Sequence, residues 1–124
     1  FVHTTFMRQA HYTSIKAEAG VSEFDLSGLT PEHTADFKAP FVKESNIKLG
    51  MSFQQEIPIE INGTSLIIGQ VEHIILPDGA MDDGGHLDLG AHSVTGLSGL
   101  NTYYSLKRGA RYPYVQDEFT LEDL

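Results

Sequence analysis

Apolar and polar residues alternate along residues 47–61, the most regular pattern in the chain. Odd positions carry Ile, Leu, Met or Phe, with Gln55 as the exception, whereas even positions carry Lys, Gly, Ser, Gln, Glu or Pro. A period of two places successive side chains on opposite faces of a β-strand, so the pattern predicts one long strand. A ladder of this length needs a bulge or a bend, which we expect within residues 54–58, where Pro58 removes a backbone donor.

Asn62-Gly63 follows this strand and is the dipeptide most typical of a two-residue hairpin loop. Residues 66–76 are then the returning strand, with a register fixed by the loop. The expected pairs are Ile59 with Leu66, Ile57 with Ile68, and Ser52 with His73. Because the returning strand carries apolar residues on both faces, we expect a barrel or a covered sheet and a mainly β chain.

The amino-terminal segments are predicted from propensity and capping. Residues 1–6, rich in β-branched and aromatic side chains, are expected as a strand, and residues 7–12 as one or two helical turns. Ser22 is placed to cap a short helix over residues 23–29. The Thr30-Pro31 step ends that helix, because the residue before a proline disfavours the α conformation.

Loops and extended segments make up the rest. Residues 31–40 are expected as a loop or an edge strand. The Pro-Asp-Gly and Asp-Asp-Gly-Gly turns predict an exposed acidic loop over residues 77–85. Glycines stand beside aromatic residues in 96–104, as happens where a backbone approaches another surface closely. Residues 112–114 are expected to be extended, and residues 117–124 form an acidic tail.

Composition narrows the classes of protein. The chain has 124 residues and a formal net charge of −9, from 8 Lys plus Arg against 17 Asp plus Glu. This length predicts a single domain, 1–124, and the acidic balance argues against binding to nucleic acid or anionic membranes. The absence of Cys excludes disulfides and thiolate chemistry. No run of about 18 apolar residues occurs, so we expect a cytoplasmic protein with no membrane span.

Two kinds of enzyme site are not supported by the sequence. His86, Asp88 and His92 are the densest group of metal-ligand types, but neither the HExxH nor the EF-hand spacing is present, so a solvated loop is favoured and no metal is predicted. The GxSxG, Walker A and GxGxxG motifs are also absent, which removes the signatures of three nucleotide-binding or hydrolase folds.

His73 and a group of tyrosines are better placed for an aromatic ligand. Gly69 shares the face of His73 and leaves room for a flat ring; the alternative, favoured on these residues alone, is a histidine hydrogen-bonded to Ser52. Tyrosines and cations gather further along the chain, namely Tyr103, Tyr104, Lys107, Arg108, Arg111, Tyr112 and Tyr114. They suit an anionic aromatic ligand, and an interface strand explains them equally well.

Six segments, in order, form a distributed pattern. They are His11-Tyr12-Thr13-Ser14, GVSEFDLSGLT at 20–30, APFVKES at 39–45, GQVEHI at 69–74, GLSGLNTYY at 96–104 and Arg111-Tyr112-Pro113-Tyr114. Their order and spacing resemble the FMN-binding split-barrel flavin reductases of the flavoredoxin type over nearly the whole chain. The resemblance implies a split β-barrel with short helices, of which this chain is the carboxy-terminal two-thirds.

The same resemblance implies a function. It implies a homodimer that binds FMN noncovalently and passes electrons from NAD(P)H to flavin or another acceptor. Thr13 and Ser14 are implied to lie near the flavin, His73 to contact the flavin or nicotinamide ring, and Tyr103 or Tyr104 to approach from the closing strand. No catalytic residue is assigned, because the isoalloxazine ring itself carries the hydride chemistry.

Departures from the family pattern leave an alternative open. The amino-terminal strands that hold the FMN phosphate in the family have no counterpart in this sequence, and Ile75 stands where relatives often have a second His. The alternative is a noncatalytic dimeric split-barrel protein that has lost flavin binding.

Overall fold

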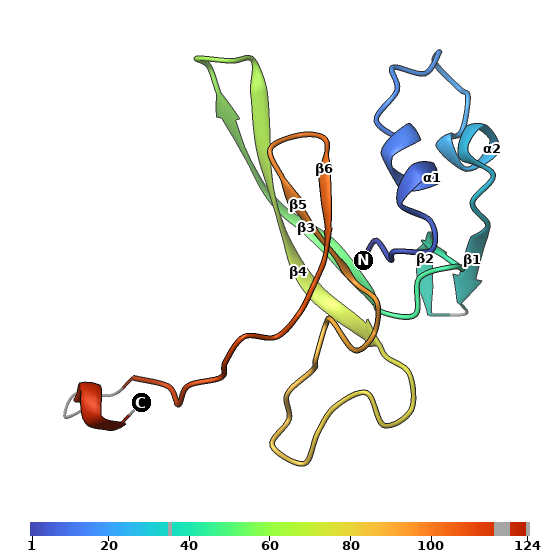
Figure 1. The fold of residues 1–124 in the computed structure, drawn as a ribbon. Helices are drawn as coiled ribbons and strands as arrows, with labels where there is room; N and C mark the ends of the chain where they lie inside the picture. The colour runs from blue at the N-terminus through green and yellow to red at the C-terminus, as the bar shows by residue number, and fades with distance from the viewer. Residues whose placement is uncertain (35, 116–119, 124) are drawn as a thin grey trace.

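The computed structural model is built from antiparallel β-hairpins and short helices (Figure 1). It describes residues 1–34, 36–115 and 120–123. The elements are α1 (Met7–Tyr12), α2 (Glu23–Ser27), β1 (Pro31–Thr34), β2 (Phe37–Val42), β3 (Lys48–Ile59), β4 (Thr64–Ile75), β5 (Thr95–Ser98), β6 (Thr102–Ser105) and the 3₁₀ turn η1 (Leu121–Asp123). In the described part of the chain, β1–β2, β3–β4 and β5–β6 each form a separate two-stranded sheet.

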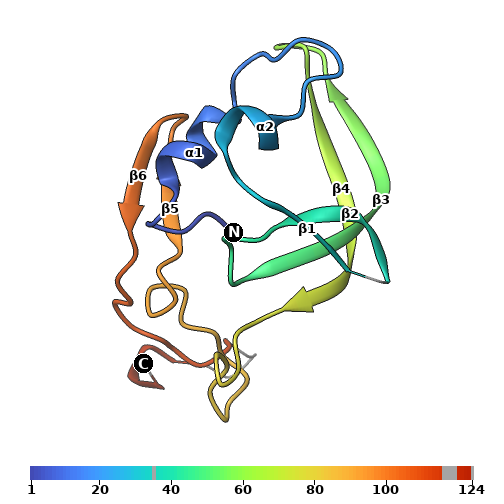
Figure 2. The ribbon, with the colours of Figure 1, turned by 90° about the vertical axis from the view of Figure 1, so that its right-hand side faces the viewer.

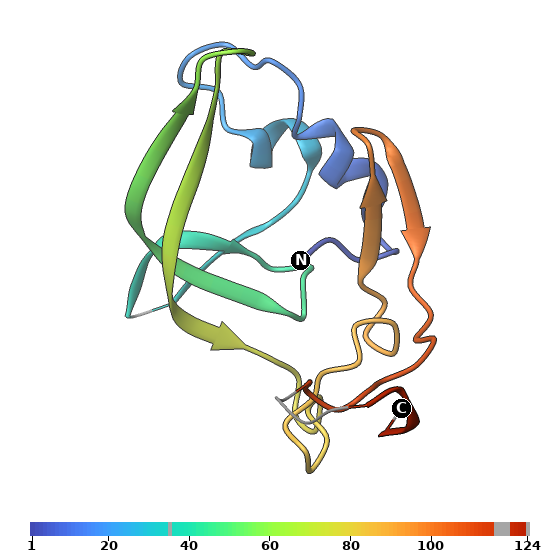
Figure 3. The same ribbon diagram turned by 90° about the vertical axis from the view of Figure 1, so that its left-hand side faces the viewer.

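The hairpins lie on different sides of the molecule. The long, curved β3–β4 hairpin lies on one side, β5–β6 on the opposite side, and α1 and α2 across one end (Figures 2 and 3). The β1–β2 hairpin crosses the ribbon near the base of β3. Among the described helices, none is long and apolar enough to span a membrane. The mainly β architecture with short helices is as predicted.

The ribbon predicted from the alternating pattern is β3–β4, but its loop differs from the prediction. The observed pairs include Ile59 with Thr64 and Ile57 with Leu66, in place of the predicted ones. A type I′ turn needs positive φ at both central residues, whereas only Gly63 has it, at 67°. The Asn62 side chain instead accepts hydrogen bonds from the backbone and hydroxyl of Thr64. The two-residue loop is therefore wrong, and residues 60–63 form the connection.

Two bulges shift the register further along the ribbon. One lies at Gln54, the first residue of the interval predicted for it, and the other at Glu72, where none was predicted. Because one bulge lies on each strand, their shifts cancel beyond Glu72, and the longer connection alone places His73 opposite Gly50. The predicted pairing of Ser52 with His73 is wrong, and Ser52 pairs with Gln70.

The helices agree with the predictions except at one end. The Ser22 side chain accepts a hydrogen bond from the backbone of Phe24 at 3.2 Å, which is the predicted cap of α2. The helix ends at Ser27, before the predicted residue 29, because Gly28 takes a left-handed conformation with φ 71°. Residues 31–34 and 37–40 are strand, the second of the two expected states for this segment.

The strand predicted over residues 1–6 is wrong. His3 makes an isolated bridge with Val94, and the backbone of Phe6 turns back to donate to the His3 carbonyl. Residues 77–85 are largely exposed, as predicted, although Ala80 is buried. Of the predicted acidic tail, residues 117–119 and 124 lie outside the described residues.

The core sits at the base of the β3–β4 hairpin. Its buried apolar residues are Phe6, Leu29, Phe41, Ile47, Ala80 and Val94. Buried polar groups are hydrogen-bonded, as burial requires: the Ser45 hydroxyl lies 2.7 Å from the Ile47 carbonyl and 3.2 Å from His3 Nε2, and Lys48 pairs with Glu32. This cluster ties the amino-terminal segment to β1 and β3.

Candidate functional site

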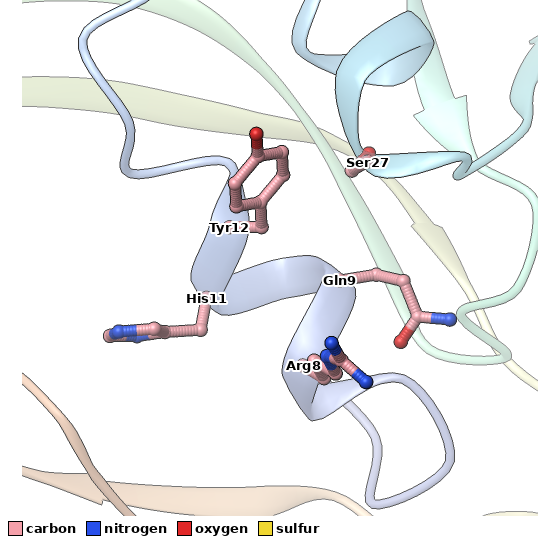
Figure 4. A pocket seen from close by; sticks show the side chains of 5 residues that line it. All are labelled: Arg8, Gln9, His11, Tyr12 and Ser27. Carbon is pink, nitrogen blue, oxygen red and sulfur yellow. The ribbon is translucent and has the colours of Figure 1, made fainter.

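Two neighbouring cavities lie against α1. The larger, of about 590 Å³, is lined by Arg8, Gln9, His11, Tyr12 and Ser27 (Figure 4). The smaller, of about 270 Å³, is lined by Met7, Arg8, His11, Asn101 and Tyr103. Arg8 and His11 line both cavities. Figure 4 shows Gln9 and His11 leaving α1 on opposite sides with Arg8 between them. We call Arg8, His11, Tyr12 and Tyr103 the α1 site.

The α1 site joins segments far apart in sequence. The Tyr103 hydroxyl lies 3.4 Å from His11 Nδ1, across a separation of 92 residues. The two rings meet edge to face, with centroids 5.8 Å apart and an interplanar angle of 88°. This contact brings β6 to the last turn of α1. Tyr103, predicted as a ligand residue, therefore lies beside the helix that precedes Thr13 and Ser14.

Thr13 and Ser14 lie at the carboxyl end of α1. Thr13 caps the helix, and its hydroxyl donates to the Ala10 carbonyl at 2.7 Å. Its side chain lines a third cavity, of about 370 Å³, whose other walls include Phe6, Leu29 and Phe41. Ser14 is exposed. Thr13 thus stands between the α1 site and a cavity with a mixed lining, in which apolar side chains lie beside Ser45 and Lys48.

His73 is placed elsewhere. Its ring meets Phe37 edge to face with centroids 5.3 Å apart, and its strand position faces Gly50. The expectation that Gly69 shares the face of His73 is wrong, because the bulge at Glu72 puts the two residues on opposite faces of the hairpin. A Cβ at Gly69 would lie 3.0 Å from Met51 Cε, so Met51 occupies the space over Gly69 in which a flat ring was expected. No contact joins His73 to the α1 site among the described residues, and its role toward a ligand stays a prediction.

The tyrosines and cations near the carboxyl end do not gather as a group. Tyr104 pairs with Gly96 on β5 and is half exposed. Tyr112 and Tyr114 are 61% and 88% exposed. The guanidinium groups of Arg108 and Arg111 instead pair with Asp88 at 3.6 Å and Asp82 at 3.0 Å. Of this set, Tyr103 alone has a described contact with α1.

The acidic loop is organised by its own hydrogen bonds. Asp82 accepts from the backbone N–H groups of Gly84 at 2.9 Å and His86 at 3.0 Å. The bond from His86, with those from Arg111 and Gly84, lowers the pKa of the Asp82 carboxyl. No group of three or more His, Cys, Asp or Glu in residues 1–34, 36–115 and 120–123 is arranged to hold a metal ion.

Arg8 was missed by the sequence analysis, which used His11 and Tyr12 only as part of a resemblance. A signal was present: within a helix over residues 7–12, Arg8 lies three residues before His11 and four before Tyr12, so the three share one side of the helix. The contact from Tyr103 has no such signal, because it depends on the path of β6.

The chain resembles three solved structures. It is 39% identical, with a TM-score of 0.85, to a "putative flavin reductase with split barrel domain" from Shewanella frigidimarina NCIMB 400. The match covers 92% of this chain and 58% of the Shewanella chain. It is 19% identical, with a TM-score of 0.69, to flavoredoxin of Desulfovibrio vulgaris (Miyazaki F), and this match covers 97% of this chain and 61% of the flavoredoxin chain. It is 23% identical, with a TM-score of 0.72, to nitrilotriacetate monooxygenase component B from Bacillus cereus, and this match covers 88% of this chain and 55% of the Bacillus chain.

The three comparisons agree on the fold and on its extent. No family model and no curated protein matches the sequence. The second and third structures, at 19% and 23% identity, show the fold, and the first adds a close sequence match over the same elements. The chain spans 58% of the first structure and similar shares of the others. It resembles the flavin reductase-like split-barrel family in fold and, through the first structure, in sequence.

Proposed function

We propose that this chain is part of a flavin-dependent oxidoreductase that binds FMN and passes electrons from NAD(P)H to flavin or another acceptor in the cytoplasm. The observation that carries the proposal is the meeting of Tyr103 with His11, next to Thr13 and Ser14, in a chain 39% identical to a structure described as a flavin reductase. Three residues expected near the flavin thus lie at one end of one helix.

The residues of the α1 site fit such a cofactor. A planar ring needs aromatic or apolar walls, which Tyr12, Tyr103 and the apolar side chains of the cavity beside Thr13 supply. Thr13 and Ser14 would lie at the ring edge, Tyr103 and Tyr104 would approach from β6, and His73 would act from the opposite wall. When bound, flavin supplies the hydride and electron chemistry. The protein positions it and excludes water.

We also propose that the protein is a homodimer. The register places six apolar residues on one side of the β3–β4 hairpin, which we call the outer apolar face: Leu49, Met51, Phe53, Ile67, Val71 and Ile74. Each is at least 39% exposed in the single chain, and Phe53 reaches 66%. A contiguous apolar patch of this kind marks an interaction surface.

The test uses the purified chain with FMN. We expect flavin absorbance bands, quenching of flavin fluorescence at micromolar protein, and FMN reduction that depends on NAD(P)H. Tyr103→Ala, which removes the ring that contacts His11, should weaken quenching about 10-fold, whereas Tyr114→Ala, at an exposed position, should leave it unchanged. A colourless chain that neither quenches flavin nor reduces it would overturn the proposal.

The alternative is a noncatalytic dimeric split-barrel protein that has lost flavin binding. One observation favours it: Met51 occupies the space over Gly69 that was expected to receive a flat ring. The variant Met51→Ala would open that space. If FMN binds to Met51→Ala but not to the unchanged chain, the alternative is correct and the side chain of Met51 is its cause.

A further inference from the structure

Arg8 is a cation that faces two cavities without a partner. It has no ion pair or hydrogen bond among the described residues, whereas Arg108 and Arg111 each pair with a carboxylate. Of the three arginines in the chain, it is the one without a described ion pair. A guanidinium group that is not neutralised internally is suited to an anion from outside.

The two cavities offer further hydrogen-bond donors. The side chains of Gln9, Tyr12 and Asn101 carry amide or hydroxyl donors, whereas the Ser27 hydroxyl already donates to the Phe24 carbonyl at 3.5 Å. No Asp or Glu is found in the described lining. His11 uses Nδ1 toward Tyr103, which leaves Nε2 without a described partner. Many donors around one guanidinium match a phosphate monoester, which carries close to two negative charges and three acceptor oxygens.

Each of the two cavities that Arg8 lines also contains a tyrosine. Tyr12 lines the larger cavity and Tyr103 the smaller one, with Arg8 and His11 common to both. We propose that Arg8 and His11 bind the phosphomonoester group of a nucleotide, with its planar part against Tyr12 or Tyr103. The identity of the nucleotide rests on the proposed function: it is FMN or the phosphorylated nicotinamide nucleotide.

Matched ligand pairs test the proposal on the full chain. FMN carries a phosphomonoester that riboflavin lacks, and NADP⁺ carries one that NAD⁺ lacks. Flavin binding is measured by fluorescence quenching and nicotinamide nucleotide binding by calorimetry. We expect the phosphorylated member of one pair to bind at least about 10-fold more tightly, as for a charge-assisted hydrogen bond. Arg8→Gln should abolish that preference, and Arg8→Lys should retain part of it, because lysine keeps the charge but not the fork.

Lys38→Gln is the control for charge, since Lys38 is an exposed cation on β2 away from both cavities. It should leave both preferences unchanged. The pair that responds to Arg8→Gln identifies the phosphate. If neither pair shows a preference, or if Arg8→Gln behaves like Lys38→Gln, the inference is wrong. Should no flavin bind at all while NADP⁺ binding depends on Arg8, the proposed function fails and the phosphate site stands. If the protein reduces flavin but neither binding preference depends on Arg8, the phosphate site is wrong and the proposed function stands.

Discussion

The base and the outer face of the β3–β4 hairpin differ in how well their apolar residues are covered. At the base, Ile47 is 1% exposed and Gly50 is in contact distance of Phe41. On the outer apolar face, Phe53 and Ile74 are 66% and 63% exposed. Both regions share one alternating sequence pattern. The pattern therefore specifies the strand, whereas burial depends on which neighbour the path of the chain supplies.

Removing a core side chain at the base should have the largest effect. Ile47→Ala creates a cavity in the most completely buried site and should lower the free energy of unfolding by about 2–5 kcal/mol. Ile61→Ala, the same substitution at a residue 94% exposed, should change it by less than about 0.5 kcal/mol. Urea unfolding followed by circular dichroism measures both. Equal losses would mean that the two regions do not differ in packing.

Filling the close contact at Gly50 should have the next largest effect. An alanine Cβ there would lie 3.1 Å from both Phe41 Cζ and His73 Cβ, so Gly50→Ala should cost about 1–3 kcal/mol of stability by overpacking. Gly109→Ala is the matched control, because nothing lies within 4 Å of its Cβ position. Comparing the unfolding midpoints tests the contact. A neutral Gly50→Ala would show that Phe41 and His73 are free to move apart.

Local sequence signals predicted the elements that depend on neighbours along the chain. The alternating pattern predicted the β3–β4 ribbon, and Ser22 predicted the cap of α2. The register failed at the turn itself, because it required the length of the connection, and the two bulges, one on each strand, alter only the pairs between them. A register error of this kind moves every later pair, so the partner of His73 was wrong although its strand was correct.

In the candidate site, too, the features that depend on neighbours along the chain were the predictable ones. Thr13, Ser14 and Tyr103 were expected near one ligand, and the structure brings Tyr103 to α1 through His11. Arg8 was accessible from helical spacing once residues 7–12 were expected to be helical. The sequence could not predict that Met51 closes the space over Gly69, because a side chain's rotamer depends on its surroundings and not on its position in the alternating pattern.

A charge on the outer apolar face should separate self-association from folding. Phe53→Glu should weaken the proposed dimer about 10-fold, equivalent to ~1.4 kcal/mol, because a carboxylate would be buried between two chains. Gln55→Glu adds the same charge at an exposed polar position and should leave association unchanged. Sedimentation equilibrium gives the dissociation constants. A large loss of monomer stability in Phe53→Glu would instead place Phe53 in the packed part of the chain.

The smallest expected effect is a pH dependence at the buried base. Burial lowers the pKa of the His3 imidazole in the folded chain, against a weaker opposing backbone bond with His92. The unfolded chain then binds the proton first as the pH falls below about 6.5, so stability is fully present above that value and declines below it. His3→Gln should flatten this part of the profile, whereas His33→Gln, on the exposed edge of β1, should leave it unchanged. Unfolding midpoints between pH 7.5 and about pH 5 test the sign. A profile that rises toward acid would mean that Ser45 and the His92 carbonyl stabilise a charged imidazole more than burial disfavours it, and the base would then be a hydrated polar cluster rather than the dry counterpart of the outer face.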